Sequence, residues 1–430
     1  MWRVDNKASS YIFGFIDSLL LIMAFSNWIF LSGKECHRSV SSYLIISITL
    51  FLLYKSRVNR NLLLLFSMFA YINISYVFSD ILGIGMNLGS NTLLWQEEIR
   101  SSGYVSILID AIVVFIAFFS FLLPISVFRK SAGIAKLSIQ KKDNFIIFYT
   151  LYFLSIFFWL NGYGESRGAT YESVTKPIYE YCLVIFPLMW FYSGKSNLNK
   201  GLLVFYVVIY VAKALMMGDR SSAIPMLILV FLLSPFKLNL IRVSAIIFLG
   251  ITFTNLISIY RLDFDGGDVY EKVYYLMANR SFTSDTVSQS FYTAITIFAA
   301  SDQYEMPIKY FGNFILGVFL GGSTPNADVI NLSGEFYFNR AGGFYFSWFY
   351  FWFGFFGIFI SAFILASVIR YCSNAKNYAA RLYQIMIIVF FIRWYVYTPF
   401  VLFRSVFFVF GVLLIIAAIV EYLFKKLGRE

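Results

Sequence analysis

One carboxylate and one guanidinium stand in a stretch of mostly aromatic and apolar residues, SGEFYFNRAGGFYFSWFYFWFG, which begins at Ser333. Glu335 could act as a base or bind a sugar, and Arg340 could bind a phosphate. The alternative is a structural ion pair at a membrane edge, because an unpaired charge is costly in such surroundings. Gly342 and Gly343 let the backbone turn directly after the pair. We favour a functional pair, and we assign the surrounding aromatic residues to a membrane-interface belt in preference to a sugar platform.

The turn MGDRSS, between two apolar segments, is a second candidate site. Gly218 suits the end of one helix, and Ser221 or Ser222 suits the N-cap of the next, with Pro225 in its first turn. This spacing predicts a tight helical hairpin. Because a helix start offers unpaired N–H groups, it would form an anion cradle together with the guanidinium of Arg220.

The charges of this turn also have a structural interpretation. Asp219 and Arg220 could pair at the interface, or the arginine could extend its charged end to the surface. We favour the cradle. Arg393 and Arg404 flank another outer turn, YVYTPFVLFRS, where two guanidiniums in so apolar a setting are costly unless an anion or an acid meets them.

Two more arginines, Arg280 in MANRSF and Arg167 in GYGESRGATYE, complete an expected outer-face set. Singly, each carries little information, because surface arginines are common. Asp17 and Asp110 fall inside apolar segments, where they could form relay or ion sites as in transporters. We favour instead carboxyl groups that are hydrogen-bonded to neighbouring hydroxyls.

Residue types that bind transition metals are scarce. Cys36, Cys182 and Cys372 are far apart and odd in number, and His37 is the only histidine. Neither a disulfide framework nor a zinc site can be assembled from this spacing. A metal-dependent function would need carboxylates alone, and our expectation is a protein with no metal and no cofactor.

The composition sets the class of protein that must position these residues. The 430-residue chain is 60% hydrophobic and 21% aromatic, but only 13% charged, against about 25% charged in soluble domains. These values predict an all-α, polytopic integral membrane protein. The formal net charge of +11 does not indicate nucleic acid, because the basic residues are scattered between apolar runs and form no long tract.

Twelve apolar segments have roughly the length that crosses a bilayer. They are expected at Tyr11–Leu31, Val40–Tyr54, Asn61–Phe78, Tyr104–Phe128, Phe145–Leu160, Ile178–Tyr192, Leu202–Met217, Ser222–Phe236, Val243–Ile259, Phe344–Val368, Leu382–Tyr397 and Val406–Phe424. The first is too long for the core of a signal peptide and lacks a small-residue cleavage site, so we expect a retained anchor.

Charged residues at the ends of these segments predict their orientation. An even number of spans places both termini on one side. Arg3, Lys7, the KSRVNR turn, the basic loop from Arg129 to Lys142 and the final KKLGRE all fall on that side. The positive-inside rule makes it cytoplasmic. Most of the 23 acidic residues fall in outer loops or within spans, which predicts the same topology.

One long outer segment, 261–343, stands out in a chain that otherwise forms a single transmembrane domain, 1–430. It is long enough to hold structure of its own, and we expect function to concentrate there. VYEKVYYLMANR has helical spacing from Val269 to Met277, and KYFGNFILGVFLGG is apolar over too short a length to span. Both predict helices at the outer interface, and simple packing on the bundle is a compatible alternative.

The layout and several short motifs resemble the bacterial O-antigen (oligosaccharide repeat-unit) polymerases, the Wzy family. The shared features are twelve aromatic-rich spans with both ends inside, one large outer loop late in the chain, and arginines on the outer face. The motifs are SRGATYE, GDRSS, and the loop end GEFYFNRAGGFYF followed by FGFFG. The likeness in layout covers nearly the whole chain.

This resemblance implies a membrane glycosyltransferase similar to the C-type class, in the bacterial inner membrane, with its active site facing the periplasm. It would transfer a growing polysaccharide from undecaprenyl pyrophosphate to the non-reducing end of another carrier-linked repeat unit, without metal or nucleotide sugar. A chain-length regulator protein and a flippase would act with it.

The resemblance also implies roles for individual residues. Arg220 and Arg340 would bind the leaving pyrophosphate, because fixed guanidiniums stabilise its developing charge. The incoming sugar hydroxyl needs a proton acceptor, for which Glu335 is the first choice and Asp219 the second. The further substrate-binding candidates are Arg280, Arg404, Arg393 and Arg167.

Two other classes of function remain open. A ligase that passes the finished glycan to lipid A core would share the fold and the arginines. That family's proposed mechanism uses a histidine in the large outer loop, however, and the segment 261–343 has none. A flippase or other transporter of the lipid-linked unit would place charges within the bundle core and would not need a large outer loop. We expect the polymerase.

Overall fold

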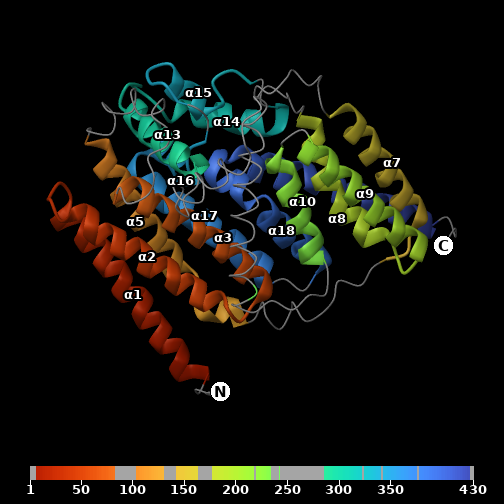
Figure 1. The fold of residues 1–430 in the computed structure, drawn as a ribbon, viewed down its shortest axis with the longest axis horizontal. Helices are drawn as coiled ribbons and strands as arrows, with labels where there is room; N and C mark the ends of the chain where they lie inside the picture. The colour runs from red at the N-terminus through yellow and green to blue at the C-terminus, as the bar shows by residue number, and fades with distance from the viewer. Residues whose placement is uncertain are drawn as a thin grey trace, which may run out of the picture.

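The computed structural model describes most of the chain, and Figure 1 shows it as one assembly of helices. The described residues are 6–82, 103–129, 142–162, 177–216, 219–233, 242, 285–321, 324–339, 342–374 and 377–426. Within helices, the side chains of residues 6–9, 177, 216, 220, 285 and 374 are not described. Every regular element in these ranges is a helix.

Seven helices in the described ranges are long and apolar enough to cross a membrane, as expected of a polytopic membrane protein. They are α1 (Asn6–Leu31), α2 (His37–Ser56), α3 (Arg60–Tyr76) with its continuation η1 (Val77–Ile81), α5 (Tyr104–Leu122), α9 (Asn197–Met216), α17 (Phe355–Asn374), and η5 (Val401–Val409) continued by α19 (Phe410–Lys426). The remaining elements are shorter: α7 (Phe145–Asn161), η3 (Pro177–Tyr179), α8 (Glu180–Tyr192), α10 (Arg220–Leu233), α13 (Asp285–Ser301), α14 (Lys309–Leu320), α15 (Val329–Gly334), α16 (Tyr345–Phe353), α18 (Tyr378–Val389) and η4 (Arg393–Tyr397).

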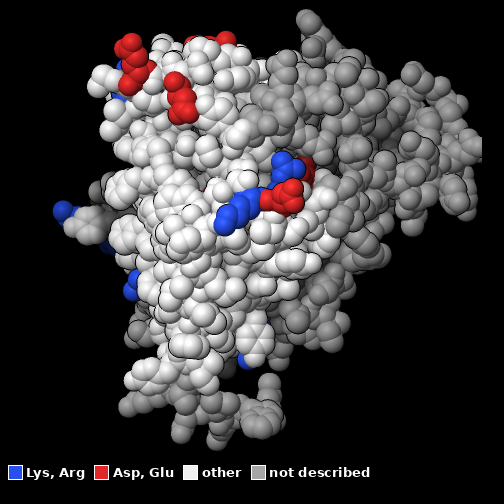
Figure 2. Space-filling view, turned by 90° about the vertical axis from the view of Figure 1, so that its left-hand side faces the viewer, with Lys and Arg blue, Asp and Glu red and all other residues white. Residues whose placement is uncertain are grey.

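Helix α1 leaves most of its apolar surface exposed. It packs against α2 and α5, and Asp17 and Ala24 are buried, whereas Tyr11, Phe15 and Ile22 are exposed. The side of the molecule where α1 and α2 lie faces the viewer in Figure 2, and most of its described surface is free of charged residues. Such a surface suits contact with lipid, because the backbone groups of a helix are already paired within it.

Two predicted spans end earlier than their apolar runs. The predicted tenth span, Phe344–Val368, is not one helix. α16 ends at Phe353, and the next residue, Gly354, has a φ of +58° and a ψ of −150° that break the helix before α17 begins. Residues with a side chain rarely adopt that conformation. The predicted fourth span, Tyr104–Phe128, ends as a regular helix at Leu122, two residues before Pro124. In both cases the hydrophobic run continues past the backbone break.

Two other predictions fall on parts of the chain that are not described. The predicted span Val243–Ile259 and the predicted interfacial helix from Val269 to Met277 both lie outside the described residues.

Helices α13, α14 and α15 lie together at one end of the bundle (Figure 1), and we call them the cap. The short helix predicted in KYFGNFILGVFLGG is confirmed as α14. It buries Phe314 and Val318 and exposes Leu316, Phe319 and Leu320. The last three would suit a membrane interface, so its interfacial position stays a prediction.

The start of α15 is set by a side-chain cap. Asp328 accepts a hydrogen bond from the backbone N of Ile330 at 2.8 Å. Burial raises the pKa of the Asp328 carboxyl, and the backbone hydrogen bonds to Ile330 and Asn331 oppose that rise. The cap is also tied to α5, because the Tyr104 hydroxyl donates to Asp302 at 2.8 Å.

Aromatic side chains fill the centre of the bundle. Phe69, Phe115, Phe119 and Tyr395, from three different elements, pack with ring centroids 5.2 to 6.4 Å apart. Such contacts add stability beyond the area that they bury. The bundle therefore offers a rigid support for the helix ends that carry the candidate site.

Candidate functional site

The hairpin predicted at MGDRSS is confirmed: α9 ends at Met216, α10 begins at Arg220, and the two helices pack together. Its cap differs from the prediction. The N-cap is Asp219, whose Oδ1 accepts from the backbone N of Ser222 at 3.2 Å and from Ser221 Oγ at 2.6 Å. Either aspartate or serine can cap a helix, and here the residue nearest the end of α9 does so.

Arg393 also binds the start of α10. Its Nε donates to the Ser221 carbonyl at 3.0 Å, and its Nη2 donates to Ser221 Oγ at 3.0 Å and Ser222 Oγ at 3.3 Å. Nη1 forms an ion pair with Glu180, the first residue of α8. The structure thus brings Asp219 and Arg393 together through Ser221. We call Asp219, Ser221, Ser222, Glu180 and Arg393 the α10 node.

The charges of the α10 node compensate one another. A guanidinium beside a helix N-terminus is unfavourable by itself, because both carry positive charge. Glu180 and Asp219 offset this, and both interact with Arg393. The Arg393 side chain is 10% exposed and that of Glu180 is 32% exposed. The node therefore holds the first turn of α10 in place while one of its carboxylates stays in contact with solvent.

Arg404 lies at a different helix end. It belongs to η5, and its Nη1 donates to the carbonyls of Gly317 and Val318 at 3.1 and 3.2 Å. These carbonyls are in the last turn of α14, where a cation is favourable. The next residue past that helix, Gly321, has a φ of +120°, and a Cβ there would lie 3.4 Å from Arg404 Nη2. Arg404 thus fixes the cap to η5.

Glu335 lies on the exposed surface at the C-terminal end of α15. Its Oε2 accepts a hydrogen bond from the Tyr304 hydroxyl at 2.9 Å, and the same hydroxyl lies 3.1 Å from the Leu332 carbonyl. Burial, followed by this hydrogen bond, raises the pKa of Tyr304. Glu335 is therefore oriented by Tyr304, which is not a residue of the α10 node.

The remaining predicted site residues fall where the structure gives no side chain. Arg167, Arg280 and Arg340 lie outside the described residues, and of Arg220 only the backbone is described. The proposed pairing of Glu335 with Arg340 and the substrate roles of all four arginines stay predictions.

Asp17 and Asp110, the two acids within apolar segments, accept hydrogen bonds from hydroxyls, as we favoured from the sequence. Each of them also contacts a basic residue. Asp110 accepts from Ser32 Oγ at 2.6 Å and lies 2.7 Å from His37 Nε2. Asp17 accepts from Ser120 Oγ at 2.7 Å and pairs with Lys55 at 2.9 and 3.0 Å.

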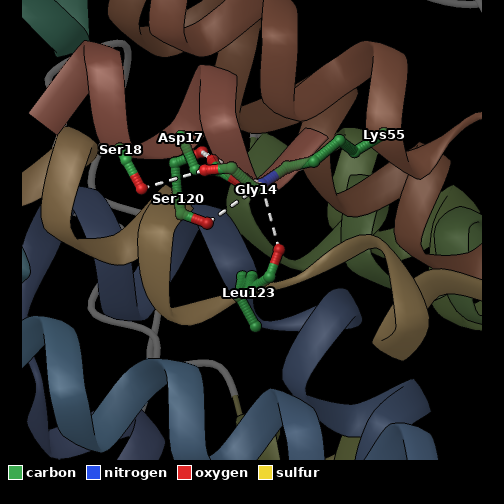
Figure 3. Close-up of polar contacts among 6 residues, drawn as sticks. All are labelled: Gly14, Asp17, Ser18, Lys55, Ser120 and Leu123. Atoms are coloured by element: carbon green, nitrogen blue, oxygen red, sulfur yellow. Dashed lines mark hydrogen bonds and ion pairs between the residues drawn. The ribbon is translucent and has the colours of Figure 1, made fainter. Parts of the chain in front are cut away.

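The burial of Lys55 is not expected from the sequence, which predicts the KSRVNR segment to be a cytoplasmic turn. The side chain is fully buried. Its Nζ also donates to the Ser120 carbonyl, Ser120 Oγ and the Leu123 carbonyl at 2.9 to 3.1 Å. Figure 3 shows Asp17, Ser120 and Leu123 gathered around the ammonium. We call this set the Lys55 node.

Sequence reasoning missed two charged residues of these nodes, Glu180 and Lys55, and one of them carried a signal. Glu180 is the only acid in the predicted span Ile178–Tyr192. A lone acid in a span is a functional candidate by default. Lys55 carried no such signal, because a lysine beside a basic turn is what the positive-inside rule leads one to expect.

Neither cofactors nor relatives identify this site. In the described part of the chain, no group of three or more His, Cys, Asp or Glu is arranged to hold a metal ion. Comparison with protein-family models, with curated proteins and with solved structures finds no match to this chain.

Proposed function

We propose that this chain is an O-antigen polymerase, a membrane glycosyltransferase that joins undecaprenyl-pyrophosphate-linked repeat units into polysaccharide. In this proposal it spans the bacterial inner membrane twelve times with both termini in the cytoplasm, and the cap faces the periplasm. A flippase supplies its substrate, and a chain-length regulator protein acts with it.

The observation that supports this proposal most is the fixed start of α10. Transfer from a lipid pyrophosphate develops negative charge on the leaving oxygen, and donors that are already in place stabilise it best. The first turn of α10 presents the N–H groups of a helix start, of which Asp219 caps that of Ser222, and Arg220 is its first residue. Because Arg393 bonds both serines of this turn, the donors need no rearrangement during the reaction.

The proposal assigns roles by charge. Arg220 and Arg340 bind the pyrophosphate, and Arg393 acts mainly as a positioning residue, since Glu180 already neutralises it. The sugar hydroxyl gives its proton to an outer carboxylate. The assisting arginines are Arg404, which also anchors the cap, and Arg280 and Arg167.

The first test is the surface polysaccharide of the native host without this gene, with and without a plasmid copy. A polymerase predicts loss of the long ladder while one repeat unit stays attached to core. Loss of all attached glycan with lipid-linked polymer accumulating indicates a ligase instead, and repeat unit trapped in the cytoplasm indicates a transporter.

The same strain tests the arginine assignment. Arg220→Ala should abolish long polymer at normal protein level, because one such donor contributes about 3 kcal/mol, roughly a 100-fold change in rate. Arg220→Lys should restore only part of the long polymer if the arginine contacts the phosphate in a bidentate way. Arg38→Ala is the matched control, since Arg38 is an exposed arginine outside the α10 node. Normal polymer in Arg220→Ala removes this residue from the site.

One observation favours a transporter as a second candidate. A transporter was expected to place charges in the bundle core, and Lys55 and Asp17 do lie there. The ammonium, which belongs to α2, is, however, surrounded by oxygens of α1 and of the end of α5, which is the arrangement of a structural lock. A transporter would need this pair to exchange protons or ions, so Lys55→Gln that folds and still moves the lipid-linked unit would remove that support.

A further inference from the structure

A carboxylate outside the predicted site lies where α3 meets the cap. Asp80 belongs to η1, a π-helical turn that continues α3. Its Oδ2 accepts hydrogen bonds from Ser79 Oγ at 2.5 Å and from Ser288 Oγ at 2.8 Å, and the two hydroxyls are 3.1 Å apart. Ser288 is on α13 and is buried. Two elements distant in the sequence therefore orient this carboxylate.

The backbone around Asp80 is unusual. π-Helical turns are rare and often lie at functional sites. The described ranges contain η1, η4 and η5, and α13 contacts both η1 and η4. η4 begins at Arg393, the cation of the α10 node. One buried helix thus connects the Asp80 carboxylate to the segment that fixes the start of α10.

A tight backbone contact lies on the same part of α13. Gly342 has a φ of +93°, and a Cβ there would lie 2.3 Å from Ser290 Oγ and 3.3 Å from the Val396 carbonyl. The chain at Gly342 therefore passes between α13 and η4 where only glycine fits. Ser290 is two residues after Ser288, so the two side chains leave α13 in different directions. The Asp80 carboxylate and the glycine loop thus contact the same turn of α13 on different sides, and the glycine loop also contacts η4.

We propose that Asp80 is the proton acceptor for the incoming sugar hydroxyl, an inference that rests on the proposed polymerase function. The hydroxyl oxygen forms a bond to the anomeric carbon of the growing glycan. The bond from that carbon to the pyrophosphate oxygen breaks, and its electron pair leaves with the carrier pyrophosphate. The hydroxyl proton passes to the carboxylate of Asp80.

Asp80 suits this role better than Glu335. Glu335 is exposed, and the Tyr304 hydroxyl of the α13–α14 connection holds it on the outer surface of the cap. Asp80 is partly buried between α3 and α13, where less water competes and the carboxylate has a fixed direction. Fixed direction and partial exclusion of water both favour proton transfer at a reacting group.

The test uses the purified full-length protein with carrier-linked repeat units extracted from the host that lacks the gene. Asp80→Asn should lower kcat about 100-fold or more while KM stays within about threefold, because the acceptor acts in the transition state. Glu305→Gln, an exposed acid of the cap region, is the matched control and should leave both constants unchanged. A rate for Asp80→Asn within about tenfold of wild type overturns the inference.

Ser288→Ala decides the case in which Asp80→Asn does not fold. This variant keeps the carboxylate and removes one of its donors, and we expect about a tenfold loss of kcat with KM unchanged. An unchanged kcat in a folded Ser288→Ala protein then overturns the inference. Absence of polymer from the wild-type protein is a separate outcome, because it removes the proposed function itself.

Discussion

Two buried cations in this molecule are held in opposite ways. Lys55 is bonded to five oxygens at 2.9 to 3.1 Å, and its side chain and that of Asp17 are 0% and 3% exposed. Arg393 is 10% exposed and pairs with Glu180, which is 32% exposed. The Lys55 node is closed to solvent, whereas the α10 node reaches it.

This difference indicates which buried charge is available for chemistry. An ammonium has three donors, and the Lys55 node supplies more than enough acceptors for them. It joins α1, α2 and the end of α5, so its role is to hold helices together. The α10 node instead fixes a helix start that faces a solvent-accessible carboxylate. Burial of a charge alone would not have separated the two.

The largest effect on stability is expected at the Lys55 node. Lys55→Met leaves Asp17 as an uncompensated buried carboxylate and should lower the free energy of unfolding by about 3–5 kcal/mol. The measurement is the folded fraction after heating in detergent, followed by size-exclusion chromatography. The double variant Lys55→Met/Asp17→Asn is the control and should recover most of this loss, because no unpaired charge remains.

Either of two results would break the comparison. A Lys55→Met protein as stable as wild type would mean that the Lys55 node is not a lock. A double variant that stays folded but loses polymer would give the closed node a role in function that its geometry does not suggest.

At the α10 node we expect a smaller loss of stability and a larger loss of function. Arg393→Lys keeps the charge but not the fork that reaches both serines and Glu180. Because solvent can reach Glu180, we expect about 1–2 kcal/mol of destabilisation. Polymer should be shortened or lost while protein level is kept. Normal polymer length in Arg393→Lys would show that the exact position of α10 does not matter.

The sequence predicted well those features that depend on local residue types. The polar break MGDRSS between two apolar segments placed the α9–α10 hairpin, although its N-cap is Asp219 and not a serine, and a short apolar run predicted α14 as a helix too short to span. Composition predicted the class of protein. In each case the deciding interactions are within a few residues of one another, so the pattern contains them.

Pairings between distant segments could not be predicted in this way. Arg393 meets Glu180, and Ser288 meets Asp80, only because helices far apart in sequence pack together. Gly354 divides a span through its backbone conformation, while the hydrophobic run around it is unbroken. Lys55 shows the limit of charge rules, because the same residue type suits a cytoplasmic turn and a buried lock.

The smallest effect on stability is expected from Asp219→Asn, which separates the capping role of Asp219 in the α10 node from the role of its charge. Asparagine caps a helix about as well as aspartate, so Ser221 and Ser222 keep their acceptor. Loss of the charge near the helix start and Arg393 should lower the free energy of unfolding by about 0.5 kcal/mol. Polymer length should stay normal on the polysaccharide gel. Asp17→Asn is the matched control on the same gel: it leaves Lys55 without its carboxylate and should lower the protein level. Loss of polymer in a folded Asp219→Asn protein would instead make Asp219 the proton acceptor and would contradict the assignment of Asp80.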